Sequence, residues 1–455
     1  MAQLETHRGS IADRMDRLPF SSFHRNFLLM ITAGEWVETL MLLGNGVLLA
    51  LVARVLGFST EVATYVIPVS FFAGEFVGSI VCGYIADRRG RKTVFLFNLL
   101  VYGIAMLIAG FMSISYVLAI LVFIAGIGVG GEFPLVDTYT SEVVPARLRG
   151  RGMAAVYTVA VTAAPLIAFL AYLVSHPSPG PYSWRILFWL MGVCAIAVWL
   201  VRLTLPESPR WYEIRGRLDD AERVMSQIEE QVMKEHNLST LPSVESSLSI
   251  APTPSRYLDI FAPDLRSRTI MMLVFQFFQT GIFYGFTSLA PTFLLHKGIN
   301  LVHTLLFSMI IYAGFFFGSI ANLFIIDRIE RKWGIVGSAV IAGILGTAFA
   351  LIPNVTATVV LGFLVTFTLW NFSNFLHTYQ AEIFPTRVRS SAAGTVYSVS
   401  RISTSILVLL ISAVFLPRGL VATFGIIWVF IAIVALDVGL FGPRSSRLRL
   451  EEIAR

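Results

Sequence analysis

The sequence has few charged residues and only two cysteines. Charged residues make up 14% of its 455 positions, whereas hydrophobic residues make up 56% and the mean hydropathy is +0.75. A soluble chain carries about a quarter charged residues, so this composition excludes an ordinary soluble enzyme and indicates lipid as the solvent. Cys82 and Cys194 both fall within apolar runs, which argues against a structural disulfide.

Several kinds of functional motif are also missing. No Gly-Lys-Ser/Thr loop is present to bind nucleotide phosphates, so ATP is not expected to drive the protein. No cysteine or histidine cluster has metal-ligand spacing, and no Ser, His and Asp set points to hydrolysis. We therefore expect no enzymatic activity, no cofactor and no metal.

Twelve apolar runs are long enough to cross a bilayer, which takes about 20 helical residues. Alternating strand patterns are lacking, so helices are the expected spanning elements. The runs cover residues 27–53, 64–86, 93–113, 116–139, 151–175, 184–205, 269–295, 304–326, 334–353, 356–380, 391–416 and 420–441. The first run is too long for a signal peptide and follows a polar, basic leader.

Positive charges gather at alternate ends of these runs. The basic ends include Arg25, Arg88, Arg147, Arg210, Arg328 and Arg444. The net charge of +6 therefore reflects membrane topology and does not indicate nucleic-acid binding. By the positive-inside rule, both termini and the long central loop are expected in the cytoplasm.

The runs and charges divide the chain into five expected parts. They are a cytoplasmic leader at 1–26, a six-helix bundle at 27–205, a cytoplasmic linker at 206–267, a second six-helix bundle at 268–441 and a cytoplasmic tail at 442–455. Within the linker, Leu218–Lys234 is expected to form an amphipathic helix with Ala221, Val224, Met225 and Ile228 on one face. The linker lets the two halves move against each other.

A short sequence motif occurs twice, 240 positions apart. Val77–Lys92 reads VGSIVCGYIADRRGRK and Phe317–Lys332 reads FGSIANLFIIDRIERK, and Thr138–Gly152 returns as Thr378–Ala392. Two blocks at one offset indicate a duplicated unit, and a duplicated membrane unit usually encloses its ligand site between the copies. We predict an all-α membrane protein with twelve transmembrane helices in two pseudo-symmetric six-helix bundles.

Several stretches resemble the major facilitator superfamily. GYIADRRGRK at 83–92 is similar to its loop 2–3 motif, and PESPRW at Pro206–Trp211 resembles the branch of sugar porters, organic ion transporters and aromatic-acid symporters. GIGVGGEFP at Gly126–Pro134 and the leader Ile11–Arg25 resemble its metabolite and aromatic-acid symporters. The resemblance implies the major facilitator fold and alternating access; we expect a monomer in a bacterial inner membrane, driven by the proton gradient.

The first span departs from this resemblance. Aromatic-acid symporters have an Asp-Gly-X-Asp run there, whereas this chain reads Glu38-Thr-Leu-Met41 and has a further acid at Glu35. The first acid of the run is thus retained as Glu38, and the second is lost.

Arg401 is the central charged residue of the second half. It lies about ten residues into its span, roughly 15 Å from the cytoplasmic end, and organic anion transporters carry a similar arginine. A guanidinium is permanently charged and its fork fits a carboxylate, whereas the repeat mate, Val161, is apolar. We predict that Arg401 binds an anionic substrate; a permanent pair with a helix acid is the alternative. The other predicted substrate-binding residues are Gln276, Gln279, Tyr284, Asn374, Tyr157 and Tyr397.

Acids within the spans are candidates for carrying a coupled proton, because an ionisable group in lipid is costly unless it is paired or hydrated. Glu35 and Glu38 share one face of the first span. Glu132 and Asp137 in the fourth span are further candidates, with structural pairing as the alternative. Glu75 in the second span is expected to be structural, because that helix is usually peripheral to the cavity in the resembled fold.

The repeated cytoplasmic cassettes carry charges that can pair. Glu142 is expected to pair with Arg88 or Arg91, and its repeat mate Glu382 with Arg328 or Arg331. Exposed pairs contribute about 0–1 kcal/mol each, which suits a latch that opens in every cycle. The resemblance implies that these groups stabilise an outward-facing state; charges that only set topology are the alternative. The predicted latch residues are Asp87, Arg88, Arg91, Glu142, Asp327, Arg328, Arg331 and Glu382.

These observations predict a proton-coupled symporter of a small organic anion, such as an aromatic or heterocyclic carboxylate. One alternative is a proton antiporter that exports organic cations or drugs, with the acids binding the cargo. A second alternative is a sugar or polyol porter, which the PESPRW stretch favours. A nutrient sensor is the weakest alternative, because the termini are short.

Overall fold

Long apolar runs become helices in this structure, a computed structural model that describes residues 11–242, 257–326, 328–384 and 389–445. Within these ranges the chain forms helices joined by turns and loops, and no strand is present. Eleven helical stretches are long and apolar enough to cross a bilayer, and Ser115–Val129 is a shorter apolar helix. The predicted fold class is confirmed.

The first bundle contains nine α-helical pieces. They are α2 (Ser22–Leu56), α3 (Thr60–Thr64), α4 (Ser70–Arg89), α5 (Arg91–Ala109), α6 (Ser115–Val129), α7 (Glu132–Val143), α8 (Ala146–Ala160), α9 (Ala163–Ser175) and α10 (Ser183–Arg202). The predicted fourth span is divided between α6 and α7, and the fifth between α8 and α9. A π-helix, η2 (Tyr65–Val69), joins α3 to α4 around Pro68, whose missing N–H interrupts the regular helix pattern.

The second bundle contains seven α-helical pieces. They are α13 (Arg266–Thr287), α14 (Ala290–His296), α15 (Leu301–Ile325), α16 (Arg331–Leu351), α17 (Val355–Ile383), α18 (Arg389–Leu410) and α19 (Leu420–Phe441). A second π-helix, η4 (Ile411–Phe415), follows α18. The span formed by α17 is continuous, whereas its counterpart in the first bundle is broken before Glu132.

The duplication is visible in the packing of glycines. A Cβ at Gly74 of α4 would lie 2.1 Å from the carbonyl oxygen of Phe123, and one at Gly314 of α15 would lie 2.3 Å from that of Phe363. The two glycines and the two carbonyls are each 240 positions apart. Small residues let helix backbones approach closely in a membrane, so α4 meets α6 as α15 meets α17.

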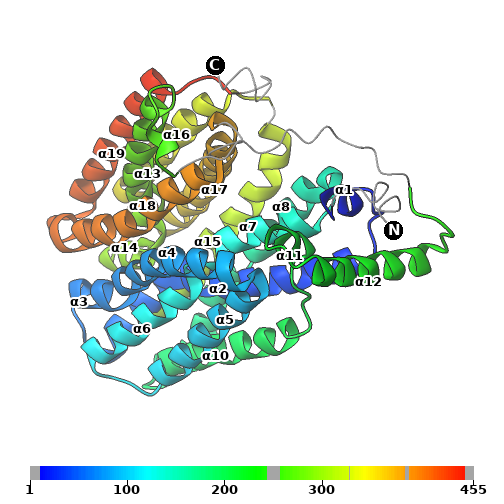
Figure 1. Ribbon diagram of the computed structural model, residues 1–455. Helices are drawn as coiled ribbons and strands as arrows, with labels where there is room; N and C mark the ends of the chain where they lie inside the picture. The colour runs from blue at the N-terminus through cyan, green and yellow to red at the C-terminus, as the bar shows by residue number, and fades with distance from the viewer. Residues whose placement is uncertain (1–10, 243–256, 327, 385–388, 446–455) are drawn as a thin grey trace.

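The two bundles meet closely at one end of the molecule. There α14 packs on α2, and α3 packs on η4. In Figure 1 the bundle of α2 to α10, coloured blue to blue-green, and the bundle of α13 to α19, coloured green to red, converge at this end, and their opposite ends point apart. Predicted topology places the converging end outside the cell, because α2 runs toward it from the cytoplasmic leader.

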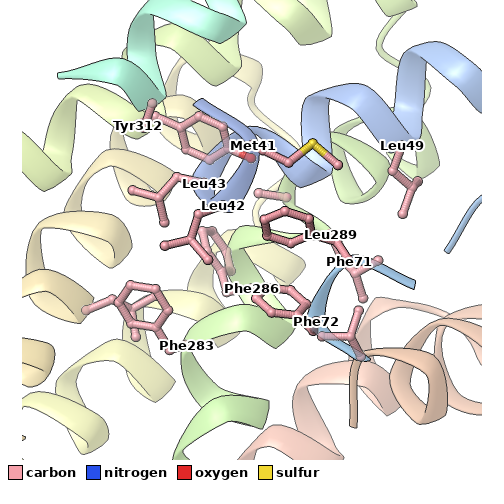
Figure 2. Packing of buried hydrophobic residues seen from close by; sticks show 14 of the residues in the cluster. Met41, Leu42, Leu43, Leu49, Phe71, Phe72, Phe283, Phe286, Leu289 and Tyr312 are labelled. Atoms are coloured by element: carbon pink, nitrogen blue, oxygen red, sulfur yellow. The ribbon is translucent and has the colours of Figure 1, made fainter. Parts of the chain in front are cut away.

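Apolar side chains from both bundles fill the converging end. Figure 2 shows them in one cluster, which we call the outer seal: Met41, Leu42, Leu43, Leu49, Phe71, Phe72, Phe283, Phe286, Leu289 and Tyr312. Gly46 of α2 contacts the turn before α14 so closely that a Cβ would lie 2.6 Å from the carbonyl oxygen of Ser288. The space between the bundles is thus closed on the predicted outer side.

The leader and the linker pack together. The leader forms α1 (Ile11–Asp16), and the linker forms α11 (Pro209–Ile214) and α12 (Leu218–His236). Ala221, Met225 and Ile228 are buried against α1 and Val224 packs beside them, so the predicted amphipathic face is confirmed.

Ion pairs hold this contact. Arg14 lies 2.5 Å from Glu222 and 2.6 Å from Glu229, and Arg17 lies 2.6 Å from Glu229. Burial opposes the ionisation of Glu229, but hydrogen bonds from Arg14 and Arg17 outweigh it and hold its pKa below the usual value. The stabilisation from this carboxylate is therefore present at neutral pH and is lost as the pH falls through the lowered pKa.

Candidate functional site

Arg401 lies in the seam between the two bundles, where α18 packs on α4. Its Nη1 is 3.3 Å from Oε2 of Glu75 and donates to the Tyr284 hydroxyl at 3.1 Å. Its Nη2 donates to the Tyr397 hydroxyl, and its guanidinium lies 4.6 Å from the centre of that ring. We call Arg401, Glu75, Tyr284 and Tyr397 the arginine cluster; it joins the second bundle to an acid of the first.

Neighbouring helices hold the arginine cluster in place. Tyr397 and Arg401 are four residues apart and so share one face of α18. Tyr284 of α13 packs edge-on against Phe72 of α4, with ring centres 4.8 Å apart. Arg401 is 4% exposed and Glu75 is 1% exposed, so the charges have little contact with water and each depends on its partner.

The structure brings three of the predicted substrate residues, Arg401, Tyr284 and Tyr397, together. Gln276 and Gln279 take part instead in a buried amide chain of the second bundle: Gln279 donates to Gln276 at 2.9 Å, and Gln276 donates to Gln380 at 2.6 Å. Asn374 on α17 and Tyr157 on α8 are half-buried. The roles of all seven predicted substrate residues stay predictions.

The expected position of Glu75 is wrong. It does not lie on a helix apart from the site, because its carboxylate pairs with Arg401 of the other bundle. Gly74, its neighbour in α4, is pressed against α6. This contact fixes the rotation of α4 and turns the next side chain toward α18. Sequence reasoning found the acid and its depth but not the direction in which it points.

The predicted proton-carrying acids lie within the first bundle. Glu35 and Glu38 of α2 are 0% and 2% exposed. Glu38 and Glu132 line a cavity of about 10 Å³ together with Asn98 and Tyr102 of α5, which is close to the space of one water molecule. The side chain of Asp137 lies outside the described part of the structure. Proton coupling at these four acids stays a prediction.

Glu132 has a cation partner that the sequence analysis missed. Nη1 of Arg202, at the end of α10, lies 2.5 Å from Oε1 of Glu132, and the arginine is completely buried. Arg202 also donates to the carbonyl oxygens of Met30 and Ile31. The signal was present, because Arg202 falls within the predicted run 184–205 and is charged, but its partner is 70 positions away in the sequence.

The cytoplasmic cassettes form equivalent pairs in the two bundles. Arg91 is 3.3 Å from Glu142, and Arg331 is 3.4 Å from Glu382. These are the predicted pairings, and each lies within one bundle. Arg88 and Arg328 are exposed. The side chain of Asp87 and all of Asp327 lie outside the described residues, and the latch role of the whole group stays a prediction.

The side chain of Glu207, in the PESPRW stretch after α10, caps the start of α5. Its carboxylate accepts hydrogen bonds from the backbone N–H groups of Arg91 at 2.9 Å and Lys92 at 3.2 Å. These groups have no partner within the helix, and the positive helix end attracts the carboxylate. Burial nevertheless raises the pKa of Glu207. The motif therefore ties the start of the linker to the second loop of the first bundle.

A larger cavity of about 800 Å³ opens at the predicted outer ends of α2, α9 and α15. Its lining includes Arg54, His176 and His303 and contains no aspartate or glutamate. Tyr172 lies beside His176, with ring centres 5.5 Å apart. Arg54 is the charged side chain of this lining, so the cavity favours anions over cations. Among the described residues, no group of three or more His, Cys, Asp or Glu side chains is placed to hold a metal ion.

Known proteins resemble the chain along nearly its whole length. Residues 19–455 match the family described as Sugar (and other) transporter. The inner membrane metabolite transport protein YdjE of Escherichia coli is 28% identical over 98% of each chain. The niacin transporter NiaP of Acinetobacter baylyi is 26% identical over 86% of this chain and 87% of its own.

A solved structure supports the fold. A partially occluded inward-open conformation of the xylose transporter XylE from E. coli superposes with a TM-score of 0.74, at 18% identity, over 94% of this chain and all of that one.

Proposed function

Because the chain belongs to the Sugar (and other) transporter family of the major facilitator superfamily, whose members are transporters and not enzymes, we propose that it is a proton-coupled symporter of a small organic anion. The proposed cargo is a flat aromatic or heterocyclic carboxylate. The proposed site is the arginine cluster, and the proton gradient supplies the energy without a bound cofactor. We further propose a monomer in the bacterial inner membrane with both termini in the cytoplasm.

One observation carries this proposal: the guanidinium of Arg401 lies between the two bundles, beside two tyrosines. A permanent cation at this place matches a substrate carboxylate in charge and in fork geometry. The rings of Tyr284 and Tyr397 offer a flat apolar surface with a hydroxyl at its edge, which suits an aromatic acid. The NiaP relative is named for niacin, which is a heterocyclic carboxylate of this kind.

The closed outer seal fits a cycle of alternating access. With the seal formed, cargo at Arg401 has no path to the outside, and the site exchanges with the cytoplasm when the opposite ends stand apart. Rocking of the bundles would open the seal and admit an anion from outside. Arg54 in the lining of the 800 Å³ cavity would raise the local concentration of anions on that side.

A sugar or polyol is the second candidate substrate. The family description and the buried amide chain of Gln276, Gln279 and Gln380 favour it, because amides bind sugar hydroxyl groups well. Arg401 argues against it, because a guanidinium fork matches a carboxylate better than the hydroxyl groups of a neutral sugar.

Uptake by the purified protein in proteoliposomes tests these alternatives. Nicotinate, nicotinamide and D-xylose have different charges or shapes and form the core of a panel of acids, amines and sugars. With an inward proton gradient imposed, acidic outside and alkaline inside, we expect accumulation of one or more carboxylates but not of their neutral amides. Arg401→Ala should abolish this uptake while the protein stays folded. Accumulation of xylose alone would support the sugar reading, and expulsion of amines would support an antiporter.

A further inference from the structure

We propose that Glu75 carries the coupled proton and that it occupies, in the empty transporter, the place on Arg401 that the substrate carboxylate takes. This inference rests on the proposed function and deepens it. Substrate and proton would then be coupled by competition for one guanidinium, without a separate relay.

The geometry supports an exchange of carboxylates. Oε2 of Glu75 is 3.3 Å from Nη1 of Arg401, a distance at which the two charges attract strongly but the fork is not closed. The other groups in the arginine cluster, the hydroxyls of Tyr284 and Tyr397, are neutral and remain available to orient an incoming acid. Glu75 can therefore leave the guanidinium while Arg401 keeps its hydrogen bonds to the two tyrosine hydroxyls.

Charge balance makes the exchange obligatory. Arg401 cannot release its proton, and a buried ion without a partner is strongly unfavourable. Two states keep the seam neutral: Arg401 paired with ionised Glu75, or Arg401 paired with the substrate carboxylate while Glu75 is protonated. Moving from the first state to the second takes up one proton for each carboxylate bound. Substrate without proton leaves an extra negative charge, and proton without substrate leaves an unpaired guanidinium.

The other charged and titratable groups near Glu75 are less suited to this exchange. Glu132 of α7 already pairs with Arg202 within the same bundle. Glu35 and Glu38 of α2 interact electrostatically with each other, and Glu38 also interacts with Glu75 and Arg401. Glu38 lines the small cavity beside Glu132 and the phenol of Tyr102.

On the side of the second bundle, Arg401, Tyr397 and Tyr284 face Glu75, and His377 of α17 lies near Tyr397, with ring centres 6.5 Å apart. Among the ion pairs described for these residues, the one that crosses between the bundles is that of Glu75 with Arg401.

The repeat supports a functional pair. At the 240-residue offset, Glu75 corresponds to Phe315 and Arg401 to Val161, and both mates are buried apolar residues. A seam of this kind can therefore pack without charges. The charges are thus an addition to the scaffold, as a binding function requires.

Glu75→Gln tests the proposal, with Glu61→Gln at the exposed start of α3 as the matched control. The probe is nicotinate, or the panel carboxylate that wild-type protein carries fastest. In wild-type protein the affinity should fall about tenfold for each pH unit above the pKa of Glu75, with about one proton taken up per carboxylate bound. In Glu75→Gln the affinity should be independent of pH, proton uptake on binding should vanish, and counterflow should persist without proton-driven accumulation. Glu61→Gln should behave as wild type.

The outcomes separate the two proposals. Proton-driven accumulation by Glu75→Gln, or its loss in Glu38→Gln alone, overturns the role of Glu75 and leaves the symporter intact. Failure of wild-type protein to carry any carboxylate overturns the proposed function and this inference together. If Glu75→Gln does not fold, indicator-dye titration of wild-type protein decides: binding without proton uptake overturns the proposal, and Glu75→Asp should retain the uptake.

Discussion

The two bundles contact each other along two surfaces, which we call seams. The seams are related by the duplication but differ in chemistry. In one seam α4 packs on α18, and the contacts include the ion pair of Glu75 with Arg401 and a hydrogen bond from Ser405 to the Val69 carbonyl oxygen at 3.1 Å. In the other seam α8 and α9 pack on α15, where the hydroxyls of Thr158 and Ser319 lie 3.0 Å apart. The scaffold is shared, and among the described residues the ion pair that joins the two bundles lies in the first of these seams.

The same contrast extends to the acids of the first bundle. At the 240-residue offset, four of these acids correspond to phenylalanines of the second bundle. Glu35, Glu38, Glu75 and Glu132 correspond to Phe275, Phe278, Phe315 and Phe372. At these four positions the first bundle holds carboxylates and the second holds aromatic rings, and Arg401 of the second bundle pairs with one of the carboxylates. Duplication therefore accounts for the fold, and the positions where the copies differ are the better guide to function.

The largest expected effect comes from removing the charge from the first seam. Arg401→Met should abolish transport and lower the free energy of unfolding by about 3–5 kcal/mol, because it leaves Glu75 buried without a cation. The double variant Arg401→Met with Glu75→Leu should regain most of that stability but no transport, since apolar residues of similar volume replace a buried pair at little cost. Thermal unfolding in detergent and uptake in proteoliposomes measure both. Transport by the double variant would show that the charges of the first seam are not needed for function.

The buried pair of the first bundle should behave differently. Arg202→Met should also destabilise the protein by about 3–5 kcal/mol, because Glu132 loses its partner. The double variant Arg202→Met with Glu132→Leu should recover both stability and proton-driven uptake if this pair is structural. A stable double variant that lacks accumulation would instead assign Glu132 to proton coupling, as the sequence analysis predicted. Thermal unfolding in detergent and uptake in proteoliposomes decide between a structural pair and a proton-coupling role for Glu132.

A smaller effect is expected at the outer seal. Gly46→Ala places a methyl group 2.6 Å from the carbonyl oxygen of Ser288, and overpacking of this kind costs about 1–3 kcal/mol. The cost applies to the closed seal, so the population should shift toward an open outer side. Labelling of Leu289→Cys by an impermeant thiol reagent measures the shift. Gly425→Ala is the control, because nothing lies within 4 Å of a Cβ there, and it should leave the labelling rate unchanged.

The smallest effects are expected where the two bundles are most alike. Arg91→Gln and Arg331→Gln each remove the cation from one of two equivalent, partly exposed ion pairs. Each should change the free energy of unfolding by about 0–1 kcal/mol, and the two changes should be similar. Any effect on transport should appear as a change in rate, consistent with a latch. A large loss from one variant alone would show that the cassettes are not equivalent.

Much of this molecule was predictable because lipid imposes simple rules. Run length and charge placement predicted the spanning helices, and the 240-residue repeat predicted two bundles. Depth along a helix follows from counting residues, so the burial of Arg401, Glu38 and Glu75 was also predictable. The partners were not, because a rotation of one helix by a quarter turn changes which neighbour a side chain meets. Glu75 and Arg202 show this, since each pairs with a residue from a distant part of the chain.

The sequence by itself determined that the chain is a duplicated helical membrane protein with a cation placed deep in its second half. These properties follow from composition, periodicity and repetition, which need no contacts to be known. Only the tertiary structure decided that Glu75 meets Arg401 across the seam and that Glu132 meets Arg202 within one bundle. Each pairing depends on which face its helix presents, and for Glu75 that face follows from how closely the glycines of α4 and α6 let these two helices approach.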